Sequence, residues 1–312
     1  MAANVRGETA MATKTRENSA GASESARELA LRRSRKSIGR QVRSWGAVAW
    51  LWVAMIPFLY PFLFMIATAI RSPNEFLQNS VSIIPTQITF EHLQKAWTAG
   101  GLGEAMANSL YATVIGVLVS CALATTAGFF FLRNNSRPAK FVRIAIFASQ
   151  ALPAPVWLIP LYVAASDWGV ANQLWFLGIL YGLVAARFGA YLMYAYYRGL
   201  PTEIFEAARV DGASIVRQFR SIVLPLSLPP LATLVALTFV WSWGDFLLAL
   251  VFTGASGNPT VTVAAASLVG QYSTGQQTQA AALVISMVPM IFVFAFAQRF
   301  LVQGALAGSV KA

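Results

Sequence analysis

The sequence predicts an all-α integral membrane protein with six transmembrane helices, because composition, long apolar runs and the distribution of charge agree. Hydrophobic residues make up 57% of the 312 residues, charged residues 11%, and the mean hydropathy is +0.59. A soluble chain of this length needs a far more polar surface. The chain has a single cysteine, Cys121, which lies in an apolar run. One cysteine cannot form a disulfide framework or a cysteine metal site.

Residues 1–43 are rich in Ala, Ser, Thr, Glu and Arg and poor in aromatic and branched apolar residues. Such a composition cannot bury a core, so we expect a disordered cytoplasmic tail followed by a transmembrane domain over residues 44–312. Basic residues gather at the end of the tail, directly before an apolar run too long for a signal peptide. Beside a membrane span they indicate an anchor near anionic lipids rather than a nucleic-acid site.

Six apolar runs are long enough to cross a membrane, since about 20 helical residues cover a hydrocarbon core of about 30 Å. The predicted spans are residues 44–70, 105–132, 144–165, 173–197, 225–252 and 280–298. Pro153, Pro155 and Pro160 predict a kink in the third span, which either borders a pathway or serves packing. A polar stretch, residues 253–278, separates the last two spans.

Basic residues predict the orientation of these spans. Of the 23 Lys and Arg residues, 20 fall in the N-terminal tail, in the loops 133–143 and 198–220, and at the C-terminal end. Positive residues are retained on the cytoplasmic side, so we expect both termini in the cytoplasm. The net charge of +11 is then a signal of orientation and not of a preference for acidic partners.

The largest predicted external segment is residues 72–104, with a short surface helix expected over residues 85–97. We interpret this segment as a receptor for a soluble binding protein. His92 has no second ligand at a zinc-like spacing, so a solvated side chain is expected there and a metal role is not.

The longest polar interruption in the second half, residues 203–225, predicts a helix-turn-helix elbow on the membrane surface. Glu203 and Glu206 lie in the opening turns of the first helix, residues 203–210, where negative charge is favourable. Asp211-Gly212 predicts the turn, with Asp211 capping a second helix over residues 213–223 that Pro225 ends. Ile215, Phe219 and Ile222 are expected to share one face of that helix. We expect the elbow to expose side chains that a partner protein can bind: Ala207, Ala208, Ala213, Arg209, Arg217 and Arg220.

The elbow resembles the EAA loop of ABC importer permeases, whose pattern is EAA, three residues, Gly, nine residues, Ile, one residue and Leu-Pro. The matching residues are Glu206, Ala207, Ala208, Gly212, Ile222, Leu224 and Pro225. The resemblance implies that this loop, with Asp211, docks into a cleft on a separate ATPase subunit. The chain has no GxxxxGK[ST] loop, so ATP and Mg are expected on that partner, and this chain is expected to bind no cofactor and not to be an enzyme itself.

Two ionisable residues lie inside predicted spans, where charges usually face a pore or a partner. Arg187 is interpreted as lining a cavity, and Asp245 as a hydrogen-bonded packing residue; a direct pair would have to bridge roughly 10 Å of depth. The aromatic segment 239–247, which includes Trp241 and Trp243, suits either an interfacial belt or a wall facing a sugar. Arg187, Trp241, Trp243 and Asp245 are therefore the candidate pathway residues.

From about residue 45 onward the chain resembles the carbohydrate-type ABC importer permeases, the family of the second maltose permease subunit. The resemblance is carried by residues 108–110, 159–162, 200–225, 239–247 and 298–304, with Gly308, Val310 and Lys311. The sequence departs from the family at Gly244, where Asn is usual, and at Gln303, where Lys is common. The first departure removes an amide from the candidate sugar-facing wall.

This resemblance implies a type I ABC importer permease (MetI-like) fold in the bacterial cytoplasmic (inner) membrane. It implies the permease subunit of an ATP-driven, binding-protein-dependent sugar importer that works by alternating access. The implied partners are a homologous second permease subunit, two ATPase subunits, an extracytoplasmic solute-binding protein, a sugar and the lipid membrane, with no nucleic acid.

Alternatives remain open within and beyond this class. The solute could be another polar molecule, such as glycerol 3-phosphate or a polyamine, or the chain could be a secondary transporter with no ATPase partner. A membrane enzyme is disfavoured because the spans contain no carboxylate pair, Ser/His set or metal cluster.

Overall fold

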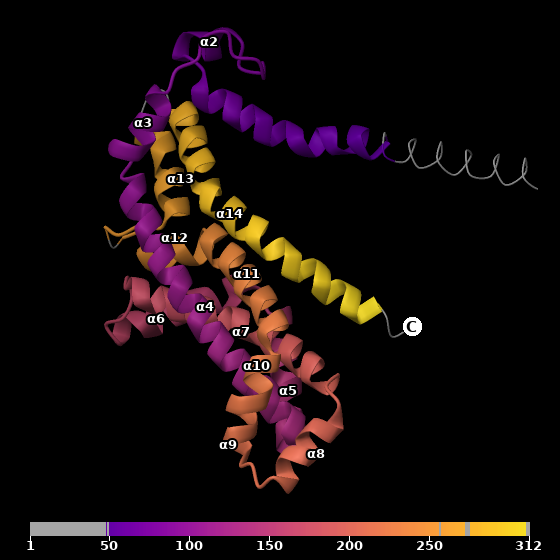
Figure 1. The fold of residues 1–312 in the computed structure, drawn as a ribbon. Coiled ribbons are helices and arrows are strands. Elements are labelled where there is room, and N and C mark those ends of the chain that lie inside the picture. Colours follow the sequence, from indigo (N-terminus) through magenta and orange to yellow (C-terminus); the bar gives the residue numbers. More distant parts are fainter. Residues whose placement is uncertain (1–47, 49, 256, 272–274, 310–312) are drawn as a thin grey trace, which may run out of the picture. The chain divides into compact units, whose positions relative to one another are not determined.

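The computed structural model describes residue 48 and residues 50–255, 257–271 and 275–309 (Figure 1). The chain divides into two compact units, Met1–Leu63 and Phe64–Ala312. The tail predicted over residues 1–43 and the C-terminal Val310 and Lys311 lie outside the described residues. The described part of the chain is helical, with one isolated β-bridge between Arg71 and Ile88 and no strand.

Four described helices are long and apolar enough to cross a membrane. They are Trp50–Ile70, α4 (Leu102–Arg133), α7 (Leu174–Arg198) and the Gly275–Gln298 part of α14 (Gly275–Ser309). Two bent helix pairs, Arg137–Ala151 with Ala154–Asp167 and Ile215–Leu226 with Leu228–Gly244, raise the number to as many as six if each pair is one span. The all-α fold that the sequence predicts is therefore confirmed, and its six spans are reached if each bent pair counts as one.

The first unit is described over its last residues, which belong to the helix Trp50–Ile70. Large apolar side chains cover this part of the helix, and Trp50 and Phe58 are 70% and 75% exposed. Such a surface is suited to lipid tails.

The predicted kink in the third span is confirmed. α5 (Arg137–Ala148) and the short η1 (Ser149–Ala151) are followed by α6 (Ala154–Asp167), and the two parts are bent by 105°. The break lies at Leu152 and Pro153, where the backbone is extended. Proline disfavours a helical residue before it and has no N–H to donate, so the helix stops there.

The fifth span differs from its prediction at both ends. The second elbow helix consists of α9 (Ile215–Gln218), the π-helical η2 (Phe219–Val223) and α10 (Leu224–Leu226), so it passes through Pro225 instead of ending there. In η2 the Leu224 N–H bonds to the Phe219 carbonyl, and this wide turn relieves the clash that proline creates in a regular helix. The 72° bend comes later, at Ser227.

Beyond the bend, α11 (Leu228–Gly244) carries the aromatic segment. The backbone becomes extended at Asp245, and a separate short helix, α12 (Leu247–Thr253), follows. The single apolar run over residues 225–252 is therefore broken before its end.

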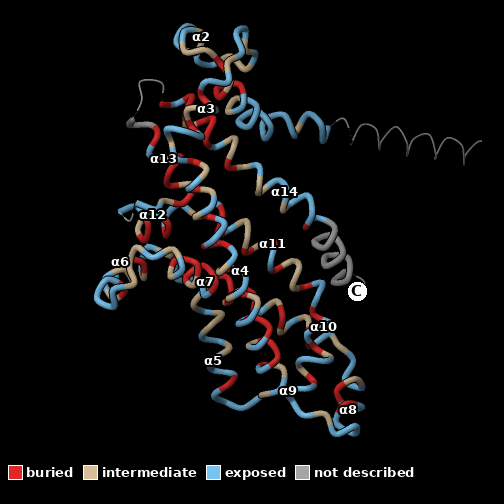
Figure 2. Tube along the Cα trace, turned by 60° about the vertical axis from the view of Figure 1, so that its left-hand side comes forward, coloured by how far each residue is buried: buried red, intermediate tan, exposed pale blue. Residues whose placement is uncertain are grey.

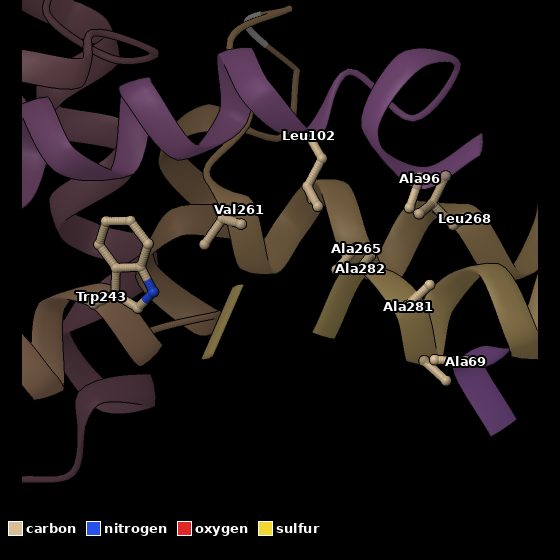
Figure 3. Close-up of a cluster of buried hydrophobic side chains, with 10 residues drawn as sticks. Ala69, Ala96, Leu102, Trp243, Val261, Ala265, Leu268, Ala281 and Ala282 are labelled. Carbon is tan, nitrogen blue, oxygen red and sulfur yellow. The ribbon is translucent and has the colours of Figure 1, made fainter. Parts of the chain in front are cut away.

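A further helix, α13 (Val261–Gln271), lies in the stretch that the sequence suggested to be a polar connection. Its Val261, Ala265 and Leu268 are buried and pack with Leu102 and Ala281 in one apolar cluster (Figure 3). Their spacing of four and three residues is that of a helical face.

Close packing of α4 and α7 forms the centre of the second unit, and many of their residues are buried (Figure 2). Glycines allow this approach: a Cβ added to Gly182 would lie 2.5 Å from the Val119 Cβ, and one on Gly116 would lie 2.9 Å from the Tyr181 Cβ. Small residues let helix backbones come together in membranes, where the hydrophobic effect drives no association.

Within the second unit, α2 (Pro73–Gln78) and α3 (Glu91–Thr98) lie at one end, and α8 (Thr202–Val210) and α9 lie at the other (Figures 1 and 2). The elbow and the segment predicted to be external are thus at opposite ends of the spans.

Candidate functional site

The elbow consists of α8, a turn and α9, as the sequence predicts. Its first helix packs through Phe205 and Ala208, which are 8% and 6% exposed, and leaves Glu206 and Ala207 exposed. The expectation that Ala208 is exposed is therefore wrong. Helical geometry places residues three apart on one face, so Ala208 joins Phe205 on the packed face.

The turn between the helices depends on Gly212, whose φ is +70°. Its N–H bonds to the Arg209 carbonyl at 3.0 Å, and the next N–H, of Ala213, bonds to the Ala208 carbonyl at 2.9 Å. Glycine adopts this left-handed conformation without a Cβ penalty, and such a turn satisfies the last carbonyls of a helix.

Ser214 caps the second helix, and not Asp211 as predicted. The Ser214 hydroxyl accepts the Arg217 N–H at 3.3 Å, while Asp211 lies at the end of α8 and its N–H bonds to the Ala207 carbonyl. The turn is longer than the Asp-Gly pair alone, so the capping position moves to the next residue with a short polar side chain.

Sequence reasoning missed the side chains that hold the turn of the elbow and that join its end to the spans. Gln218 is 1% exposed, and its Nε2 donates to the Ala213 carbonyl at 2.9 Å. The Ser227 hydroxyl lies 2.9 Å from the Tyr197 hydroxyl, and the Tyr196 hydroxyl donates to the Leu226 carbonyl at 2.8 Å. The last two bonds connect the end of α7 to the bend before α11.

The tip of the elbow exposes apolar side chains beside the polar Asp211 and Ser214. Val210, Ile215 and Val216 are 88%, 58% and 59% exposed. The Phe219 N–H bonds to the Ile215 carbonyl one helical turn back, and Phe219 and Ile222 are half-buried whereas Ile215 is exposed. A cluster of exposed apolar side chains on a polar loop is typical of a protein contact.

Arg187 lines a groove of about 500 Å³ between α4, α5 and α7. Its Nη1 donates to the Ser149 carbonyl at 2.9 Å and its Nε to the Val184 carbonyl at 3.3 Å. The first of these bonds attaches α7 to the end of α5, at the break in the third span.

Asp245 has different partners. Its Oδ2 accepts the Tyr181 hydroxyl at 3.1 Å and the Ala249 N–H at 2.9 Å, in the first turn of α12. Asp245 therefore stabilises the break between α11 and α12, in agreement with its interpretation as a hydrogen-bonded packing residue.

The two tryptophans of α11 have different surroundings. Trp243 is 3% exposed, stacks on Phe239 with ring centroids 5.4 Å apart, and donates from Nε1 to the Ser286 carbonyl of α14 at 2.9 Å. Trp241 is 49% exposed and meets Phe188 edge-on at 5.8 Å. In this conformation Trp241 has a free face and Trp243 packs in the core.

The segment 72–104, which the sequence predicts to be external, is held by the Arg71–Glu75 ion pair and the bonds around it. Glu75 accepts the N–H groups of Thr86 and Gln87 at 2.8 and 2.9 Å and lies 3.7 Å from the Nε of the fully buried Arg71. The bond from the Thr86 backbone lowers the pKa of Glu75. The segment is therefore a folded cap.

His92 is fully buried, so the expectation of a solvated side chain is wrong. α3 packs against α14, and the His92 Nδ1 lies 3.4 Å from the Thr278 hydroxyl. Burial lowers the pKa of His92 below its ordinary value, because the charged ring would lose its hydration. Among the described residues, no group of three His, Cys, Asp or Glu side chains is arranged to hold a metal ion.

Comparison with known proteins places this arrangement in a family. Residues 98–306 match the family model described as "Binding-protein-dependent transport system inner membrane component". The chain belongs to this family of ABC transporter permease subunits, which are multi-pass membrane proteins and not enzymes themselves. The matched region includes the elbow and the spans that carry it.

Two relatives and one solved structure are similar over most of their lengths. The osmoprotective compounds uptake permease protein GgtD of Synechocystis is 34% identical over 68% of this chain and 72% of its own. The melibiose/raffinose/stachyose import permease protein MelC of Bacillus subtilis is 27% identical over 80% and 91%. The crystal structure of a bacterial ABC transporter that imports alginate has a chain with a TM-score of 0.71 at 22% identity, covering 83% of this chain and 96% of that one, and so shares its fold.

Proposed function

We propose that this chain is the permease subunit of an ATP-driven, binding-protein-dependent sugar importer of the bacterial cytoplasmic membrane. The observation that carries the proposal is the elbow, where the EAA pattern coincides with a Gly212 turn and an exposed apolar tip. A polar loop with such a tip is suited to a protein cleft. The basic residues of loops 133–143 and 198–220 favour a cytoplasmic position for it.

The coupling residues proposed are Glu206, Ala207, Ala208, Asp211, Gly212, Ile222, Leu224 and Pro225. The partner ATPase supplies ATP and Mg, and its closure displaces the elbow. Because Tyr196, Tyr197 and Ser227 connect the elbow to α7 and α11, these spans tilt with it. Rigid-body motion of this kind exposes the solute pathway to each side in turn.

A sugar is the proposed solute. The name of MelC, a relative covering 80% of this chain, specifies melibiose, raffinose and stachyose. Trp241 offers a half-exposed ring of the kind that stacks on sugar faces, and Arg187, Trp243 and Asp245 remain candidate pathway residues. The implied assembly contains a homologous second permease, two ATPase subunits and a solute-binding protein that docks on the external segment.

A second candidate solute is a polar osmoprotective compound, because the relative GgtD is named for the uptake of such compounds. Co-purification of the tagged chain from its native membrane, followed by mass spectrometry, identifies the binding protein on which sugars and osmoprotectants can be compared by calorimetry. Recovery of the chain without an ATPase, together with uptake driven by an ion gradient, would instead favour a secondary transporter.

The coupling role is tested with Gly212→Pro. Proline cannot adopt a φ of +70° and removes the N–H that bonds to Arg209, so the turn cannot form. We expect transport to be abolished and ATPase activity to be uncoupled from it, with membrane insertion intact.

Gly169→Pro is the matched control. Gly169 also has a positive φ, +72°, and an N–H bonded three residues back at 2.9 Å, but it follows α6 and lies outside the elbow. Unimpaired uptake by Gly212→Pro, or equal losses in both variants, would count against the elbow.

A further inference from the structure

Two arginines converge on one tyrosine at the elbow end of α4, α5 and α7. Arg143 of α5 donates from Nη1 to the Tyr194 hydroxyl at 2.7 Å, and its Cζ lies 4.7 Å from the centre of that ring. The Cζ of Arg198, one turn further along α7, lies 5.8 Å from the same centre. The ring attracts both cations, but two like charges held together also repel each other.

No carboxylate in the described part of the chain neutralises this pair, whose members appear in none of the ion pairs found there: Arg71–Glu75, Glu91–Lys95 and Glu206–Arg209. A hollow of about 310 Å³ beside Arg198 is also lined by Arg133 and Arg209, with Glu206 as the acidic member of its lining. Positive charge therefore accumulates where α4 and α7 end. In a membrane protein, the ends of the spans lie at the depth of the lipid headgroups.

The groove that Arg187 lines leads away from this end and is otherwise almost entirely apolar. Its near end is formed by Phe131, which meets Tyr194 edge-on at 6.5 Å, and by Val142, the neighbour of Arg143. From Leu123 to Phe131 along α4 it extends over roughly 12 Å at 1.5 Å per residue. Its rim is open, since Phe130 and Leu183 are 49% and 47% exposed.

We propose that the tyrosine–arginine cluster and this groove together bind one anionic phospholipid. The phosphate lies between Arg143 and Arg198, whose guanidinium groups suit the paired oxygens of a phosphate. One acyl chain fills the groove towards Arg187, where apolar walls favour a hydrocarbon. The lipid connects α5 to α7 beside the elbow, and Trp241, which faces Phe188, is outside this site.

The experiment uses the complete transporter reconstituted in phosphatidylcholine mixed with phosphatidylglycerol, with the lipids that stay bound counted by native mass spectrometry. Arg143→Gln with Arg198→Gln removes the headgroup charges, and Arg137→Gln with Lys140→Gln removes two exposed cations from the same helix as a control. We expect about fivefold weaker phosphatidylglycerol retention for each of the two cluster arginines, from about 1 kcal/mol per cation near an anionic headgroup. The control should retain the lipid as the unmodified transporter does.

Ala127→Phe places a ring in the groove and leaves the arginines unchanged, so it should also release the lipid. Thermal unfolding of each variant confirms that it remains folded. Equal losses in the cluster and control variants, retention by Ala127→Phe, displacement of the lipid by inorganic phosphate, or a partner helix lying in the groove of the assembled transporter would each overturn the proposal.

Discussion

At the scale of single residues, Asp245 stabilises the break between helices α11 and α12 with one carboxylate oxygen. It accepts the Tyr181 hydroxyl and the Ala249 N–H, so Asp245→Ala leaves a buried hydroxyl and the first turn of α12 without an acceptor. We expect a loss of about 1 kcal/mol for the cap and about 1–3 kcal/mol for the orphaned hydroxyl. Thermal unfolding of the purified transporter measures this loss, with Asp167→Ala, an exposed carboxylate in the last turn of α6, as the control. Equal stability of the two variants would show that Asp245 has no structural role.

Local rules predict some of these residues and not others. Gly212 is predictable because a turn after a helix requires positive φ, and the EAA spacing marks the same position. Trp241 and Trp243 are two residues apart in one apolar segment, and only the position of α14, which accepts the Trp243 N–H, distinguishes them. The burial of His92 was not predictable for the same reason, because it depends on α14, which is far along the chain.

At the scale of elements, the contact between α4 and α7 depends on glycines that admit no side chain. A Cβ on Gly182 would lie 2.5 Å from the Val119 Cβ and 3.0 Å from the Gly116 carbonyl oxygen, so Gly182→Ala must push the helices apart. We expect a loss of about 1–3 kcal/mol, typical of overpacking, and a lower melting temperature.

Gly244→Ala is the matched control, because a Cβ there would meet only the Met290 Cε, at an ordinary 3.5 Å. Alanine is otherwise the better helix former. If the melting temperature of Gly182→Ala were no lower than that of Gly244→Ala, α4 and α7 could not be packed as closely as their glycines indicate.

The ends of helices were predictable where a residue at that position determines them by its own backbone chemistry. Pro153 breaks the third span as expected, because its effect is local. The helix through Pro225 was not predictable, since the wide turn of η2 accommodates the proline and the adjoining Val223 and Ser227 are buried among other elements. α13 did leave a signal, the spacing of Val261, Ala265 and Leu268, but neighbouring Gly, Ser and Gln residues obscured it.

At the scale of the whole molecule, the orientation of the spans decides which end meets an ATPase. The basic residues predict that the elbow is in the cytoplasm and α2 outside. Leu77 in α2 and Val210 at the elbow are 82% and 88% exposed, so a cysteine at either position should react readily once a reagent reaches it. The chain has one native cysteine, Cys121, which Cys121→Ala removes from the background.

We therefore expect a membrane-impermeant maleimide to label Leu77→Cys in intact cells and to label Val210→Cys only after the membrane is opened and the complex denatured. Denaturation matters because a bound ATPase would cover the elbow tip. Labelling of both cysteines in the opened, denatured sample confirms that each thiol is reactive, so the difference in intact cells reports the side of the membrane. Labelling of Val210→Cys in intact cells would place the elbow outside, where no ATPase could reach it. This result would contradict both the predicted orientation and the proposed coupling role.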